Sequence, residues 1–298
     1  MTKRGWILFA AMAMIWGIPY LLIKVAVAEL TPATLVLLRT TIGAALLVPF
    51  AMARGEVRPL FQRWKPVVAY TFVEVAGPWI LLADAERKLS SSLAGLLIAG
   101  VPLVGALLAW LIGGGDRPDA RRVAGLIVGF VGVGLVVSLD VATDDLLAVG
   151  EVALVVIGYA FGAMIIARQL KGVPAVGVIA ASLALTAIAY APVGIAQLPA
   201  RLPSTQVLLS VATLGIVCTA LAFLLFFALI GEVGPIRGTV ITYFNPAVAL
   251  VLGVVLLAEP LTVGMAVGFG LIALGSFVAT RRSHGMAPTT GVLSRGNP

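Results

Sequence analysis

The sequence predicts an all-α integral membrane protein, with ten transmembrane helices arranged as two inverted five-helix repeats around a central cavity. Three observations support this fold class. The 298 residues are 61% hydrophobic and 11% charged, whereas soluble domains are about one quarter charged. Apolar runs of about 20 residues, the length that a helix needs to cross a bilayer, recur along the chain. Residue patterns of the first half also return in the second half.

Five apolar runs in the first half are candidate membrane spans. The first follows Lys3 and Arg4, and its uncharged stretch 5–23 exceeds the roughly 7–15 apolar residues of a signal peptide, so we expect a retained helix. The second opens at Pro32, after a short turn. We expect the third and fifth spans to be short. The predicted spans are 5–28, 33–53, 66–83, 91–113 and 123–139.

Five more runs follow an acidic loop at 140–145. Pro174 opens the second of them, as Pro32 does in the first half. The predicted spans are 146–167, 173–197, 207–230, 238–258 and 263–279. We therefore expect a first repeat at 1–140, a second repeat at 146–282, and a polar, disordered cytoplasmic tail at 283–298.

The basic residues predict the orientation of the bundle. Cytoplasmic loops of membrane proteins are enriched in Lys and Arg. With the N-terminus inside, most of the 20 Lys and Arg residues fall in inner segments, and outer loops hold only Arg87, Lys88 and Arg201. Both termini are thus expected in the cytoplasm. The net charge of +7 is scattered over short loops rather than gathered on one face, which argues against a nucleic-acid partner.

Matching residues recur at a nearly constant offset. Pro102 and Pro246 lie 144 residues apart, and Trp16 and Tyr159 lie 143 apart. Because each half holds an odd number of helices, the second half must enter the membrane from the opposite side. Inverted repeats of this kind are typical of secondary transporters, which bind solutes near the midplane.

Three charged residues fall within predicted spans, where ionisable groups are costly and are functional candidates. Lys24 is close enough to the outer surface to snorkel, or it contacts a substrate or a counter-ion. Arg39 lies deeper and either pairs with a carboxylate or helix-end carbonyls, or faces the cavity. Glu74 lies near the middle of its span. It is either a proton-coupling group in the cavity or a neutral or paired structural acid.

Aromatic and polar residues complete the predicted cavity wall. Trp16 and Tyr20 share one helical face with Lys24. Rings in a cavity bind flat or cationic solutes by stacking and cation–π contact, although each ring could instead belong to the packing or the interfacial belt. The other members of this set are Trp79, Tyr159, Tyr243 and Asn245.

Prolines and glycines mark further features of the predicted helices. Pro19, Pro102 and Pro246 interrupt helices and are expected to be hinges, or else static kinks. Small residues four apart at 125–129 and 264–268 allow close helix packing, either within the chain or across a dimer.

Several classes of function are disfavoured by the sequence. The single cysteine, Cys218, and the single histidine, His284, leave no cluster of metal ligands and no catalytic Ser–His pair within the spans. The glycines at 113–115 are not followed by Lys-Ser/Thr, so no phosphate loop is present. We therefore expect no catalytic residues, no metal, no cofactor and no ATP hydrolysis.

Several segments from both halves form a recognisable set of motifs. They are Ile15-Trp-Gly-Ile-Pro-Tyr-Leu-Leu-Ile-Lys24, Leu30-Thr-Pro32, Arg39, 90–111 with Pro102, Asn245-Pro246, Leu257-Ala-Glu259-Pro-Leu261, and 268–275. On these segments the chain resembles the EamA family of the drug/metabolite transporter superfamily over nearly its whole length, and Gly115-Asp116 (commonly Gly-Glu) and Tyr159 (commonly Trp) depart from the family pattern.

The resemblance implies a ten-helix bundle around a central cavity that moves small metabolites, with many members exporting amino acids or related compounds. We expect an alternating-access exporter of small amphipathic metabolites in a bacterial-type inner (plasma) membrane. Its partners would be a small-molecule substrate, the lipid bilayer and a coupling proton, and the chain would be a monomer or a homodimer. The alternatives are an importer or exchanger of another metabolite or drug-like solute, a lipid-modifying membrane enzyme, and a membrane scaffold.

Overall fold

A computed structural model describes residues 2–112, 119–234 and 238–280, and every regular element in these ranges is helical. Nine helices of the described part are long and apolar enough to span a bilayer, and a shorter apolar helix, Val240–Leu256, occupies the position of the ninth predicted span. The predicted all-helical, ten-span membrane fold is therefore confirmed. The predicted tail at 283–298 and the Gly115-Asp116 pair lie outside the described residues.

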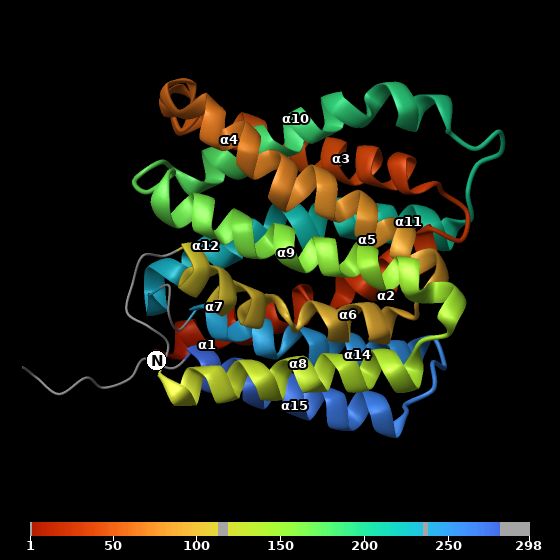
Figure 1. Ribbon diagram of the computed structural model, residues 1–298. Coiled ribbons are helices and arrows are strands. Elements are labelled where there is room, and N and C mark those ends of the chain that lie inside the picture. Colours follow the sequence, from red (N-terminus) through yellow and green to blue (C-terminus); the bar gives the residue numbers. More distant parts are fainter. Residues whose placement is uncertain (1, 113–118, 235–237, 281–298) are drawn as a thin grey trace, which may run out of the picture.

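The first half of the chain supplies five spans, several of them built from two or more helical pieces (Figure 1). In chain order its elements are α1 Lys3–Ile15, α2 Ile18–Ala26, α3 Pro32–Ala53, the 3₁₀-helix η1 Arg58–Arg63, α4 Trp64–Tyr70, the π-helix η2 Thr71–Ala76, α5 Gly77–Lys88, α6 Ser91–Ile98, α7 Val101–Ile112 and α8 Ala120–Asp140.

The second half repeats this order. Its elements are the 3₁₀-helix η3 Thr143–Asp145, α9 Leu146–Arg168, α10 Ala175–Ala196, α11 Thr205–Gly215, the π-helix η4 Ile216–Leu221, α12 Ala222–Val233, the 3₁₀-helix η5 Thr239–Tyr243, α14 Asn245–Leu256 and α15 Val263–Thr280.

The third span is longer than the sequence predicts. Instead of a short helix at 66–83, a continuous helical stretch runs over Arg58–Lys88. The expected short third span was therefore wrong, and so was the expected short fifth span, because α8 has 21 residues. The ends of the third span carry Arg63 and, in the last turn, Arg87 and Lys88. Because of these charges, both ends fall outside the apolar run from which the span was predicted. The helix nevertheless continues, since cations at its C-terminus interact favourably with the helix dipole.

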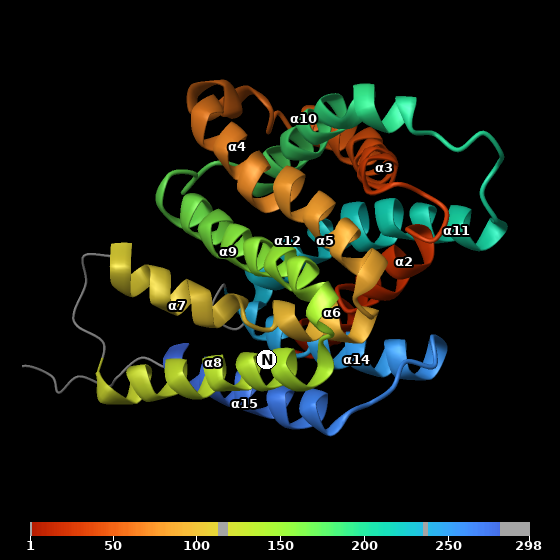
Figure 2. The same ribbon diagram turned by 45° about the vertical axis from the view of Figure 1, so that its right-hand side comes forward.

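Helices of the two halves pack against each other. The largest contacts join equivalent helices, α8 with α15 and α3 with α10, and they are followed by contacts of α5 with α9, from the third and sixth spans, and of α6 with α14. In Figure 1 the helices of the α3–α10 and α8–α15 pairs run in opposite directions. Figure 2 shows α5 and α9 side by side between these two pairs. This arrangement is that of two inverted repeats.

Glycines allow α8 and α15 to touch along their backbones. A Cβ atom on Gly125 would lie 2.6 Å from the amide nitrogen of Ala279, and one on Gly275 would overlap the backbone of Gly129. Such approach is what small residues at helix interfaces permit. Of the two expected uses of these glycines, packing within the chain is therefore the one observed.

Each of the three predicted helix-breaking prolines lies just after a break. Pro19 and Pro246 occupy the first turn of α2 and α14, and Pro102 is the second residue of α7. In the first turn a missing N–H leaves no intrahelical hydrogen bond unmade. The prolines therefore begin new helical pieces rather than bend continuous ones.

The two π-helices occupy equivalent places in the two halves. Thr71 and Ile216, their first residues, lie 145 residues apart, close to the offset of the sequence repeat. A π-turn is rare and is found mostly at functional sites, because its wider turn leaves backbone groups available to other partners. Here the Tyr190 hydroxyl donates to the carbonyl of Ala76, at the end of the first π-turn (3.0 Å).

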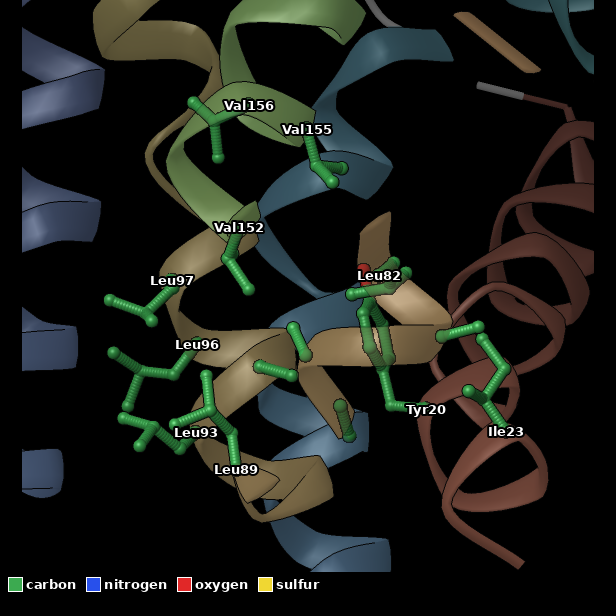
Figure 3. Packing of buried hydrophobic residues seen from close by; sticks show 14 of the residues in the cluster. Tyr20, Ile23, Leu82, Leu89, Leu93, Leu96, Leu97, Val152, Val155 and Val156 are labelled. Atoms are coloured by element: carbon green, nitrogen blue, oxygen red, sulfur yellow. The ribbon is translucent and has the colours of Figure 1, made fainter. Parts of the chain in front are cut away.

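The largest buried cluster joins both halves near the polar residues discussed below. Figure 3 shows side chains of α2, α5, α6 and α9 meeting in it, among them Tyr20, Leu82, Leu96 and Val155. Tyr159 packs against this cluster and also against a second one that contains Trp79. Tyr159 therefore lies where the two apolar clusters meet.

Candidate functional site

Arg39 lies at the centre of a buried polar group in the middle of the bundle. Its side chain comes from α3 and is 8% exposed. Nε donates to Oγ1 of Thr219 in the π-helix η4 (3.0 Å), and Thr219 in turn donates to the carbonyl of Leu214 (2.7 Å). The described residues provide no carboxylate partner for Arg39 and no hydrogen bond to its two Nη groups. Most N–H donors of this guanidinium therefore have no hydrogen-bond acceptor in the described structure.

Trp79 of α5 provides a face for the same guanidinium. The Arg39 Cζ atom lies 3.7 Å from the centroid of the Trp79 ring, in a cation–π contact. Tyr159 of α9 packs against the buried cluster that contains Trp79. Tyr20 of α2 is also buried, and it interacts electrostatically with both Arg39 and Tyr159. The structure thus brings together four of the predicted site residues, which come from both halves.

Glu74 lies in the π-helix η2, on the side facing α9. Its Oε2 atom is buried without a hydrogen-bond partner, and Glu74 interacts electrostatically with Tyr159. Gly162 of α9 makes room for this carboxyl group, because a Cβ atom there would overlap Oε2. No ion pair joins Glu74 to Arg39 or Lys24 among the described side chains. Glu74 is therefore an uncompensated carboxyl group beside the Arg39 centre.

Lys24 holds the end of a neighbouring helix. Its Nζ donates to the carbonyls of Glu86 (2.7 Å) and Leu89 (2.8 Å), at the C-terminus of α5. The last carbonyls of a helix lack intrahelical partners and carry a partial negative charge, so an ammonium group there is stabilising. The structure thus gives Lys24 partners in the backbone of α5, which the sequence alone did not indicate.

The remaining predicted site residues lie away from this centre. Trp16 packs on Phe226 and Phe223 of α12, with ring centroids 4.7 and 5.8 Å apart. Tyr243 shares a hydrogen bond with the Thr280 hydroxyl (3.2 Å). Asn245 is buried at the start of α14. In the amide orientation that satisfies it, Nδ2 donates to the carbonyls of Ile241 (3.0 Å) and Ala13 (3.2 Å).

Two carboxylates that the sequence analysis did not select are part of the polar network. Glu86 of α5 is completely buried, and neither carboxyl oxygen has a partner in the described structure. Glu259, in the segment after α14, accepts hydrogen bonds from the amides of Ser91 (2.8 Å) and Ser92 (2.9 Å) at the start of α6. An anion at a helix N-terminus is favourable for the same reason as a cation at a C-terminus.

Helical spacing could have revealed Glu86. It lies seven residues after Trp79 and four after Leu82, so the three share one face of α5. It was passed over because the predicted span ended at residue 83. Glu259 was noted only as part of a family motif.

A crevice of about 260 Å³ lies outside the Arg39 centre, between α2, α11 and the end of α14. Its walls include Leu22, Val25, Ser210, Thr213 and Leu256, and none of the predicted site residues lines it. The Arg39 centre itself is occluded in this conformation, since Tyr20, Arg39 and Trp79 are each 7–8% exposed.

Inverted repeats of membrane-spanning helices around a buried polar centre define the class of membrane transporters. Within that class, the chain belongs to the EamA-like transporter family, whose model matches residues 3–138 and again residues 146–281. The family expected from the sequence is therefore confirmed, and both matches agree with the two repeats seen in the fold. The protein is a multi-pass membrane transporter.

Individual relatives are distant but extend over nearly the whole chain. An uncharacterized transporter of Archaeoglobus fulgidus is 25% identical and covers 94% of this chain and 99% of its own. The uncharacterized transporter YvbV of Bacillus subtilis is 23% identical, covering 94% and 92%. The uncharacterized inner membrane transporter YedA of Escherichia coli K12 is 24% identical, covering 91% and 88%. A crystal structure at 23% identity has a TM-score of 0.67 over 94% of this chain, in agreement with the fold.

Proposed function

We propose that this transporter exports small amphipathic metabolites, amino acids first among them, by alternating access through the Arg39 centre. The observation that carries the proposal is the Arg39 guanidinium, buried at the middle of the bundle with its Nη groups unbonded in the described structure. A guanidinium binds a carboxylate through two parallel N–H donors. Trp79, Tyr20 and Tyr159 would form the walls for the apolar part of the solute.

The position of Glu74 favours an amino acid, rather than a simple carboxylic acid, as the substrate. Its buried Oε2 has no partner in the described structure, so the carboxylate is poised for the ammonium group of a substrate or for a coupling proton. Opposite charges on the two ends of a zwitterion would thereby be compensated in a medium where an unpaired charge is expensive. This transporter would export its substrate across a bacterial inner membrane, the location given in the name of its relative YedA, with both termini cytoplasmic.

The test is flux through the purified protein reconstituted in liposomes, measured with labelled amino acids and with the amines that lack their carboxylate. Arg39→Lys should slow amino-acid flux by about tenfold or more, because an ammonium cannot form the bidentate contact. It should leave any flux of the amines unchanged. Arg54→Lys, on an exposed arginine at the end of the same helix, is the matched control.

Unchanged amino-acid flux in Arg39→Lys would remove the carboxylate site from the proposal.

The direction of transport is tested separately, by comparing right-side-out with inside-out vesicles. Faster uptake into inside-out vesicles supports export, whereas the opposite result identifies an importer. Glu74→Gln should abolish the pH dependence of flux, and a wild-type pH profile in this variant would exclude Glu74 from coupling.

A further inference from the structure

Glu86 is a buried carboxyl group that the proposed solute site does not use. It is 0% exposed, and both Oε1 and Oε2 lack hydrogen-bond partners in the part of the chain that the structure describes. It lies 12 residues after Glu74, which is about 18 Å along a helix. The two carboxyl groups are therefore separate sites, one beside the Arg39 centre and one near the end of α5.

In the described structure no cation forms an ion pair with the Glu86 carboxyl group. Its charged and titratable neighbours are Lys24 and Tyr20 of α2, Arg39 of α3, Tyr159 of α9, and Glu259 after α14. Lys24 donates to two backbone carbonyls, and Arg39 is held by Thr219. Glu259 has the same charge sign. An ionised carboxylate without a bonded partner is strongly destabilised by burial, so this packing favours the protonated form of Glu86.

The surroundings of Glu86 close one end of the bundle. Lys24 ties α2 to the C-terminus of α5, and Glu259 ties the segment after α14 to the N-terminus of α6. We call these contacts the outer seal, made by Lys24, Glu86, Leu89, Ser91, Ser92 and Glu259. The distribution of basic residues places this end on the outer side of the membrane. The seal joins elements of both repeats, which must separate if this end is to open.

We propose that Glu86 is a proton-binding site that controls the outer seal, which is closed when Glu86 is protonated and opens when it is ionised. A proton from the outer solution binds to a carboxylate oxygen of Glu86 as the seal forms, and it returns to that solution when the seal opens. Ionised Glu86 needs water or the Lys24 ammonium. In this packing Lys24 uses two of its three N–H donors on α5 carbonyls and forms no ion pair with Glu86 in the described structure, so bringing its third donor or water to the carboxylate requires α2 to rearrange against the end of α5.

This inference rests on the proposed transport function only for the role that the outer seal would have in export. In an alternating-access exporter, proton uptake from outside would close the outer side after the solute has left. The opening itself is a property of the protein alone and can be measured without a substrate. Failure of one proposal is therefore distinguishable from failure of the other.

The single cysteine of the chain reports on the opening. Cys218 lies in the π-helix η4, is 1% exposed, and belongs to the same buried cluster as Tyr20, Leu82 and Leu89. Its alkylation by a small, membrane-impermeant maleimide, added to the outer side of the protein in nanodiscs, measures access through this end. Because thiolate is the reacting form, rates rise with pH in any variant and are compared between variants at equal pH.

Glu86→Gln keeps a neutral side chain of similar volume and should hold the seal closed. The ratio of the wild-type rate to the Glu86→Gln rate should be near one at about pH 5.5 and reach about fivefold or more at about pH 8.5. Asp84→Asn is the matched control, since Asp84 is an exposed carboxylate two residues away and pairs with Arg87. It should follow the wild type. Glu86→Asp keeps the titrating group and should restore the pH dependence.

A constant ratio over this pH range, or faster labelling of Glu86→Gln, would overturn the proposal. A second measurement uses the wild type alone and needs no variant to fold. Hydrogen exchange at the amides of Ser91 and Ser92, corrected for its intrinsic pH dependence, should lose protection as the pH rises. Protection that is constant with pH would contradict a seal controlled by Glu86.

Discussion

The guanidinium carbon of Arg39 lies 3.7 Å above the ring of Trp79, and the aromatic pair to which Trp79 belongs has a counterpart in the other half of the molecule. Tyr159 packs against the cluster that contains Trp79, and Trp16 packs on Phe223, and these pairs are related by the repeat offset of 143–144 residues. The second pair has no arginine: the position equivalent to Arg39 is Ser182, which hydrogen-bonds Thr71 (3.0 Å). The two halves therefore share their geometry, but only the first half has a charged residue, Arg39, at this position.

Trp79→Leu should impair transport more than Trp79→Phe. Leucine removes the ring that Arg39 faces, and cation–π contacts contribute about 0.5–2 kcal/mol. We expect substrate affinity to fall by about tenfold in Trp79→Leu and by less in Trp79→Phe. Binding measured by thermal shift with the transported solute tests this. Phe223→Leu is the control at the equivalent position, and an equal loss of affinity there would contradict a special role for the Arg39–Trp79 pair.

Lys24→Met should lower the stability of the folded protein. Methionine keeps the length of the side chain and removes two hydrogen bonds to helix-end carbonyls, each of the charged type worth about 1.5–3 kcal/mol. The free energy of unfolding in detergent should therefore drop by about 2 kcal/mol or more. Lys88→Met, at an exposed lysine of the same helix end, should change it by less than about 0.5 kcal/mol. Equal effects of the two substitutions would show that Lys24 is merely a solvated surface residue.

Gly162→Ala should displace the carboxyl group of Glu74. The added Cβ overlaps Oε2 and lies 3.0 Å from the Cβ atom of Glu74, so the carboxyl group must rotate and the packing of η2 on α9 must loosen slightly, at a cost of about 1–3 kcal/mol. Gly150→Ala in the same helix meets nothing within 4 Å and should be neutral or stabilising by up to about 1 kcal/mol. Unfolding and flux are measured for both. Wild-type flux and stability in Gly162→Ala would refute the close packing of Glu74 on α9.

Glu29→Gln should lower stability at neutral pH but not in acid. Hydrogen bonds from Ser204, its side chain first and then its backbone amide, hold the pKa of Glu29 below its usual range. A lowered folded-state pKa gives stability that is full above the unfolded value and is lost as the pH falls through the folded one. The melting temperatures of wild type and Glu29→Gln should thus differ near about pH 7 and converge below about pH 4. Asp144→Asn, on an exposed carboxylate, provides the comparison, and a difference that persisted in acid would argue against the Ser204 contact.

Much of the architecture was predictable because a bilayer imposes its length and polarity on every span. The positions of the ten spans, the constant offset between halves and the breaks at Pro19, Pro102 and Pro246 all follow from local sequence. The length of the third span does not. Helices can continue past the apolar region when their ends carry favourable charges, as α5 does with Arg87 and Lys88.

The polar network was only partly predictable, because several of its contacts involve the backbone. Lys24 binds carbonyls of Glu86 and Leu89, and Glu259 binds amides, and no residue type marks such partners in a sequence. Arg39 and Trp79 were both selected, but their contact joins α3 to α5, and α5 directly follows the π-helix η2, whose turn differs from the α-helical spacing assumed in the sequence analysis. No residue composition distinguishes a π-turn from an α-helical turn. A π-turn is therefore recognised only in the structure, from the altered rotation of the side chains that follow it.

The matching π-helices bear on the history of the molecule. A π-turn arises when one residue is inserted into an α-helix, and an insertion at the same place in two separate helices is a rare coincidence. The simpler origin is a single insertion in an ancestral five-helix chain, before its gene was duplicated and the copies fused. On that view the loosened third helix is older than the ten-helix carrier. It would have served a dimer of identical halves, in which both copies had to carry whatever charge Arg39 now carries alone.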